Sequence, residues 1–160
     1  QATVDAEVVL PQVLKASFFH QINDTWDVVA TVGWEDWSAF ENITVSTRRG
    51  TQLIPRNWED TYNFGLGLHY KVNEKMMLQT GIAYDTSPID DKEDRTPDMP
   101  IDEQYRLAFG LQYDWSEKIN IGGAFTYAFY GDAEIDNRLL VGDYESNEFY
   151  FFALNVSWKL

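Results

Sequence analysis

The strongest constraint on this chain is a strict alternation of apolar residues with polar or small ones, repeated in segments of about ten residues. In the segment 25–37 the apolar positions are Trp26, Val28, Ala30, Val32 and Trp34. A period of two places successive side chains on opposite faces of a β-strand. No segment shows a helical period, and no apolar run reaches the roughly 18 residues of a membrane-spanning helix. The chain is therefore predicted to be all-β.

The same alternation recurs at 62–72, 76–86, 105–115, 119–129 and 150–160. A long first strand, entering near Val8, passing Pro11 and ending near Ile22, brings the count to seven. Tight turns are predicted at 23–24, 73–75 and 116–118, whereas 38–58, 87–101 and 132–146 are long, polar and acidic. Short turns at one rim and long loops at the other predict an antiparallel up-and-down meander.

Aromatic residues mark both ends of the apolar face, which is how the lipid-facing band of an outer-membrane barrel is built. Trp26 and Trp34 bracket an aliphatic centre, and Tyr62 with Tyr70 and Tyr105 with Tyr113 do the same on other strands. Eight residues of a tilted strand span roughly 20 Å of membrane. The sequence therefore predicts a transmembrane β-barrel wall in contact with outer-membrane lipid.

The opposite face combines charges with glycines and suits a polar lumen. Asp27, Lys71 and Arg106 lie on it, and glycine recurs there at 33, 65, 67, 81, 110 and 122. A soluble lipocalin-like barrel would instead turn its aromatics inward. The glycines have two readings: they relieve curvature at bulges, or they admit a plug or ligand close to the wall.

Several functions are disfavoured by composition. A net charge of −14 argues against a nucleic-acid partner, and the absence of cysteine removes thiolate metal sites. His20 and His69 are the only histidines, and no hydrolase or phosphate-loop motif occurs. We expect no catalytic residue, no metal and no cofactor. Acidic residues between Asp85 and Asp102 offer oxygen ligands for Ca²⁺, but without an EF-hand spacing, and a solvated loop explains them as well.

Five lumen-facing residues are candidates for ligand contact. Phe19, Met77 and Phe151 are apolar side chains that break the polar inner pattern, and packing against a plug is the alternative role. Arg106 can attract a carboxylate or take part in an ion pair. His69 is either a functional group or a hydrogen-bonded wall residue.

Ordered sequence pieces resemble the outer-membrane long-chain fatty acid transporter family, which also contains channels for aromatic hydrocarbons. The pieces are Leu10-Pro11, Trp34 to Phe40, Asn57 to Tyr62 before a Gly-x-Gly strand, Gly81 to Pro88, and Pro97 to Arg106. The resemblance implies a 14-stranded barrel with an N-terminal hatch in its lumen. Residues 1–160 would be its C-terminal portion, with the hatch and first strands absent.

An odd number of strands leaves two alternatives, because single-chain bacterial barrels use even numbers. Either the segment before Pro11 supplies an eighth strand, or the chain is part of a larger barrel.

The resemblance implies passive uptake of long-chain fatty acids or other hydrophobic compounds across the Gram-negative outer membrane. The expected partners are these molecules, lipopolysaccharide and the barrel-assembly machinery. A small structural or adhesin-like barrel with functional acidic loops is the competing hypothesis. The final residue, Leu160, departs from the aromatic that usually ends such barrels.

Overall fold

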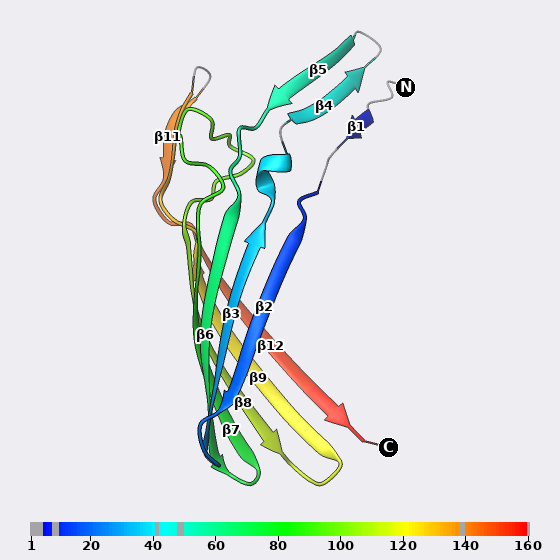
Figure 1. The fold of residues 1–160 in the computed structure, drawn as a ribbon, viewed down its shortest axis with the longest axis vertical. Helices are drawn as coiled ribbons and strands as arrows, with labels where there is room; N and C mark the ends of the chain where they lie inside the picture. Colours follow the sequence, from blue (N-terminus) through cyan, green and yellow to red (C-terminus); the bar gives the residue numbers. More distant parts are fainter. Residues whose placement is uncertain (1–4, 8–9, 41, 48–49, 138–139, 160) are drawn as a thin grey trace.

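A computed structural model describes residues 5–7, 10–40, 42–47, 50–137 and 140–159. Its main element is one antiparallel sheet of seven strands, which we call the wall (Figure 1). The wall strands are β2 (Val13–Gln21), β3 (Trp26–Glu35), β6 (Thr61–Asn73), β7 (Met76–Asp85), β8 (Gln104–Asp114), β9 (Ile119–Phe129) and β12 (Glu148–Trp158). Their order is β12-β9-β8-β7-β6-β3-β2, so each wall strand pairs with the wall strand that comes before or after it along the chain. The predicted seven-stranded meander is confirmed.

The connections alternate as predicted. The turns after β2, β6 and β8 are short and lie at the lower end of the wall in Figure 1, where β12 also ends. The connections after β3, β7 and β9 are long and lie at the upper end. In outer-membrane barrels short turns face the periplasm and long loops face the exterior, which orients the wall.

Two of the three long connections contain strands of their own. The sequence analysis predicted loops there and missed these strands. The first holds a 3-10 helix, η1 (Trp37–Ala39), and a hairpin of β4 (Asn42–Thr47) with β5 (Gly50–Pro55). The third holds a hairpin of β10 (Ala133–Asp136) with β11 (Val141–Tyr144). Residues 42–47 are rich in β-branched types, which favour strands, but charged and polar neighbours hid this signal. The segment 38–58 is polar but not acidic as predicted, since it carries three arginines and one glutamate.

The predicted first strand was wrong in its extent. The wall strand β2 begins only at Val13, and residues 10–12 are not in a strand. Pro11 explains this, because proline cannot donate to a sheet ladder. Upstream, β1 (Asp5–Glu7) pairs with β4 in a separate three-stranded sheet. The described part of the segment before Pro11 therefore supplies no eighth wall strand, and the remaining residues of that alternative, 3–4 and 8–9, lie outside the described residues.

The register sorts the wall side chains into the two predicted faces. The outer face carries the aromatics: Trp26 pairs with Tyr70 at the lower rim, and Trp34 with Tyr62 at the upper rim. Most large apolar side chains on this face are exposed, and Leu154 on β12 is 90% exposed. A sheet whose apolar side is left open has lipid, not a protein core, as its solvent. Among the described residues, no helix is long and apolar enough to cross a membrane.

The described residues within 36–60, 86–103 and 130–147 form a second region, which we call the cap. It contains a small hydrophobic core of Phe40, Trp58 and Ile89, with Trp37 and Met99 packed against it. The Trp58 ring lies 4.8 Å from Phe40 and 5.4 Å from Trp37, measured between ring centroids. The first and second long connections are thus packed against one another above the wall.

Candidate functional site: the inner face of the wall

Three ion pairs connect neighbouring strands across the inner face. They are Lys15 with Glu35 at 3.0 Å, Lys71 with Asp27 at 3.4 Å, and Arg106 with Asp85. Each pair joins side chains that are two residues out of direct register, so both charges point to the same side of the sheet. The inner face is therefore polar, and these three cations are already matched by carboxylates.

Between these pairs the inner face is hollowed by a trough of about 500 Å³. The inner-face residues that line the trough are Val29, Thr31, Gly65, Gly67, His69, Gly81, Ala83, Arg106, Ala108 and Thr126. Small side chains on β6, β7 and β8 create it, because the alternation places glycine or alanine at successive inner positions.

The glycines of the inner face do not all have the same cause. A Cβ at Gly33 would lie 2.5 Å from the Asn63 side-chain amide, so glycine there leaves room for that amide. A Cβ at Gly65 would meet nothing closer than 3.7 Å, and one at Gly67 nothing closer than 3.5 Å. Both are ordinary contacts. Gly65 and Gly67 are thus not needed for packing within the described wall, and their effect is to keep the trough open.

Two of the five candidate residues line this trough. His69 lies toward its lower end, and Arg106 lies toward the cap, where its guanidinium is paired with Asp85. The ion-pair role considered for Arg106 is therefore the one that the structure shows. Arg106 still has 39% of its side chain exposed.

Two further candidates, Phe19 and Phe151, stand at opposite ends of one row that crosses the trough. The register aligns Phe19, Val29, Gly67, Gly81, Ala108, Thr126 and Phe151. Phe19 on β2 is 60% exposed and Phe151 on β12 is 51% exposed. A floor of small residues is thus flanked by two aromatic rings, an arrangement suited to an apolar guest.

Met77 does not belong to this group. It lies on the inner face nearer the short turns, and it lines a smaller polar hollow with Lys71, Gln112 and Asn120. Sequence reasoning also missed trough residues on the inner face, namely Val29, Thr31, Ala108 and Thr126. Alternation assigns them the right face, but only the strand register shows that they are neighbours.

The sequence pieces that suggested a family meet at the junction of wall and cap. The indole N–H of Trp34 donates to Asp60 Oδ2 at 2.8 Å, and the Ser38 N–H donates to Asp60 Oδ1 at 3.1 Å. Hydrogen bonding from the Ser38 side chain first, then from Trp34 and the Ser38 backbone, lowers the pKa of Asp60. The N–H of Glu59 donates to the Pro88 carbonyl at 2.8 Å. These pieces therefore build the rim of the wall, and three of their residues, Gly81, Ala83 and Arg106, also line the trough.

Two buried arginines connect the segments of the cap. The Arg56 guanidinium donates to both carboxylate oxygens of Asp98, at 3.1 and 2.6 Å, and also to the Thr96 hydroxyl. Arg95 donates to the carbonyl of Ile89 at 3.0 Å and to that of Glu134 at 2.9 Å. An ion pair of 3.0 Å with Asp102 completes its contacts.

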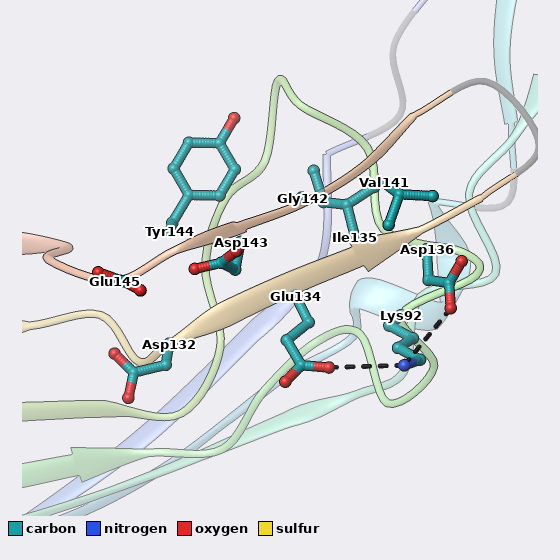
Figure 2. Close-up of a pocket in the computed structure, with 10 residues that line it drawn as sticks. All are labelled: Lys92, Asp132, Glu134, Ile135, Asp136, Val141, Gly142, Asp143, Tyr144 and Glu145. Carbon is teal, nitrogen blue, oxygen red and sulfur yellow. Dashed lines mark ion pairs between the residues drawn. The ribbon is translucent and has the colours of Figure 1, made fainter.

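An acidic pocket of about 380 Å³ lies on the β10–β11 hairpin (Figure 2). Lys92 Nζ is 3.6 Å from Glu134 and 3.5 Å from Asp136, and these carboxylates, Asp136 first, raise the pKa of Lys92. Asp132, Asp143 and Glu145 also line it. Within the described parts of the cap and wall, no three acidic or histidine side chains are grouped closely enough to hold a metal ion. The Ca²⁺ hypothesis gains no support from this geometry.

An open antiparallel wall with an aromatic-bordered outer face and a polar inner face defines an outer-membrane β-barrel protein. Residues 1–158 match the family described as outer membrane protein transport protein (OMPP1/FadL/TodX), and the chain belongs to this family. The family transports hydrophobic compounds across the outer membrane, and its relatives are transport channels rather than enzymes. The predicted resemblance and outer-membrane location are confirmed.

The similar proteins agree with this assignment. The chain is 25% identical over 120 residues to the long-chain fatty acid transport protein of Escherichia coli K12, covering 74% of this chain and 27% of that protein. It is 25% identical over 125 residues to outer membrane protein P1 of Haemophilus influenzae, covering 77% and 27%. The chain thus spans under a third of the length of these relatives.

Solved structures show the same fold. A Pseudomonas aeruginosa FadL homologue superposes with a TM-score of 0.81 at 24% identity, over 97% of this chain and 37% of that one. The Pseudomonas putida toluene transporter TodX gives a TM-score of 0.66 at 20% identity, over 97% and 36%.

Proposed function

We propose that the protein is a passive channel that takes up long-chain fatty acids or other hydrophobic compounds, and that this wall forms the C-terminal half of a 14-stranded barrel with an N-terminal hatch. The open edges support the larger barrel. In the described structure β2 and β12 each pair on one side only, and unpaired backbone groups are costly in lipid. Further strands at both edges would satisfy them.

The observation that carries the proposal is the trough with its aromatic flanks. Hydrophobic ligands bind in concave, mostly apolar sites with a few polar groups that fix orientation. The trough has small residues for its floor, Phe19 and Phe151 beside it, and Arg106 and His69 at its ends. We assign these four side chains to the ligand path. Met77, below the trough, is assigned to contact with the hatch.

The proposal includes no catalysis and no cofactor, since the lumen supplies a path and not a reaction. Its partners are hydrophobic small molecules, outer-membrane lipid, lipopolysaccharide and the barrel-assembly machinery. The competing hypothesis places the function in the acidic cap. It gains one argument from the structure: the cap is packed and presents the acidic pocket beside Lys92.

One experiment separates the two hypotheses. Gly67→Leu fills the trough at a position where a side chain has room, and Gly142→Leu adds the same group in the cap hairpin, where nothing lies within 4 Å. In cells without their own transporter, Gly67→Leu should lower uptake of radiolabelled oleate about tenfold, the scale on which apolar pockets respond to one or two methylene groups. Gly142→Leu should leave uptake unchanged. Normal uptake by correctly folded Gly67→Leu protein would refute the trough as the path.

A further inference from the structure

A second apolar hollow, of about 580 Å³, lies on the outer face of the wall near the cap. We call it the outer groove. Its outward-facing residues are Phe64, Leu66, Ile82, Tyr84, Tyr105, Leu107 and Tyr127. The groove is separated from the inner trough by the backbone of the wall, because β6, β7 and β8 are continuously paired at this level.

Side-chain size along β7 explains the groove. Ile82 pairs with Leu66 on one side and Leu107 on the other, and it is 60% exposed between them. The next outward residue of β7 away from the cap is Thr80, which is also short. Its hydroxyl donates to the Ala108 carbonyl at 3.2 Å, so this polar group is satisfied within the sheet. The surface beside the groove is therefore compatible with hydrocarbon.

The end of the groove toward the cap is different. Tyr84 and Tyr105 lie there with ring centroids 5.1 Å apart. The Tyr105 hydroxyl donates to Glu103 at 3.1 Å, and the Tyr127 hydroxyl donates to Glu148 at 3.0 Å. Aromatic rings with their hydroxyls directed to polar groups mark the depth of lipid headgroups. The groove thus runs from an apolar body to a polar mouth, as a single lipid does.

We propose that the outer groove is a binding site for one acyl chain of lipopolysaccharide. The groove is continuous with the lipid-facing surface of an outer-membrane protein, and it lies in the half of the wall next to the long connections, which faces the outer leaflet. A chain lying over Ile82 between Leu66 and Leu107 fills the hollow, and its headgroup lies beside Tyr105. This site rests on the proposed function only in taking lipopolysaccharide as a partner, and it does not depend on whether the trough conducts a ligand.

The test uses the whole protein, folded and purified from outer membranes in a mild detergent. The probe is lipopolysaccharide, counted by native mass spectrometry in a buffer with Mg²⁺, because Glu103 and Glu148 lie beside the anionic headgroup. Ile82→Trp fills the groove. Leu78→Trp is the matched control, since Leu78 also faces outward from β7 and is 38% exposed but lies outside the groove.

Wild-type protein and Leu78→Trp should retain lipopolysaccharide equally, and Ile82→Trp should retain about fivefold less, a change in the range set by filling an apolar pocket. Leu107→Trp, on the opposite side of the groove, should repeat the loss if Ile82→Trp folds poorly. Equal retention by both groove variants overturns the proposal. So does an equal loss in Leu78→Trp, which would indicate a general lipid shell, or displacement of the lipopolysaccharide by phospholipid or oleate at equal concentration.

Discussion

The wall and the cap are stabilised in opposite ways. In the wall, large apolar side chains such as Phe152 and Leu154 point outward and are 79% and 90% exposed, while charges are paired on the inner face. In the cap, Phe40, Trp58 and Ile89 are buried together and acidic side chains lie at the surface. One chain therefore turns its apolar side chains outward toward lipid in the wall and buries them in a core, as a water-soluble domain does, in the cap.

The comparison shows where each region is vulnerable. The wall draws its order from backbone ladders that need no buried core, so it tolerates changes on its inner face but not a charge facing lipid. The cap has few buried apolar side chains, and its segments are held by Arg56 and Arg95. It should respond to the loss of one buried charge while the wall stays folded.

The largest expected effect is in the cap. Arg95→Met removes the donor to the carbonyls of Ile89 and Glu134 and leaves Asp102 without its cation. Breaking a buried pair by deleting one partner costs about 3–5 kcal/mol, so the cap should open while the wall remains folded. Limited proteolysis measures cap opening, and the heat-dependent gel shift of barrels reports on the wall.

Lys92→Met is the control for this variant. Lys92 is a cap cation with 48% of its side chain exposed, so solvent screens its ion pairs and its loss should leave the cap closed. Equal protease sensitivity in the two variants would show that the cap is held by general charge balance and not by the buried guanidinium.

A smaller effect is expected in the wall. Phe109 lies on the outer face at the middle of β8, and Phe109→Arg should lower the free energy of unfolding from lipid vesicles by about 2–4 kcal/mol. Gln112→Arg adds the same charge on the inner face of the same strand. Urea titration should show little change for Gln112→Arg. A loss as large for Gln112→Arg would mean that the two faces do not differ in polarity.

The wall could be predicted from the sequence because its side chains obey a local rule. Alternation assigned Trp26, Phe109 and Leu154 to the outer face without knowledge of any partner strand, and aromatics such as Tyr62 marked the rims. The predicted start of the first strand was wrong, because Pro11 interrupts the alternation and the strand begins only at Val13.

The cap and the trough could not be predicted in the same way, because they depend on contacts distant in sequence. Arg56 meets Asp98, 42 residues away, and nothing local to either residue indicates this pair. The trough likewise requires the register that brings Gly67 beside Val29 and Gly81. Alternation was enough to predict that the five candidates lie on the inner face: Phe19, Met77, Phe151, His69 and Arg106. It could not predict which of them lie close together.

The smallest expected effect concerns Asp98 in the cap. Hydrogen bonds from Arg56, more than its charge, lower the pKa of Asp98 from 3.8 to about 2. A carboxyl with a lowered pKa stabilises the fold fully above its unfolded value, and this contribution is lost as the pH falls from about 4 through about 2. Because 62% of the Asp98 side chain is exposed, solvent screening limits its contribution to at most about 1 kcal/mol.

Asp98→Asn isolates that contribution, since other cap carboxylates such as Asp60 also have a lowered pKa. Pepsin cleavage of the cap should be faster for Asp98→Asn than for wild-type protein at pH 4, and the two rates should converge near pH 2. The fluorescence of Trp58 gives a second measurement, because the Arg56 guanidinium lies 5.5 Å from the centroid of its ring. If the two proteins differ equally at pH 4 and pH 2, the Arg56–Asp98 pair does not hold the cap through its charge, and the buried apolar core alone distinguishes the cap from the wall.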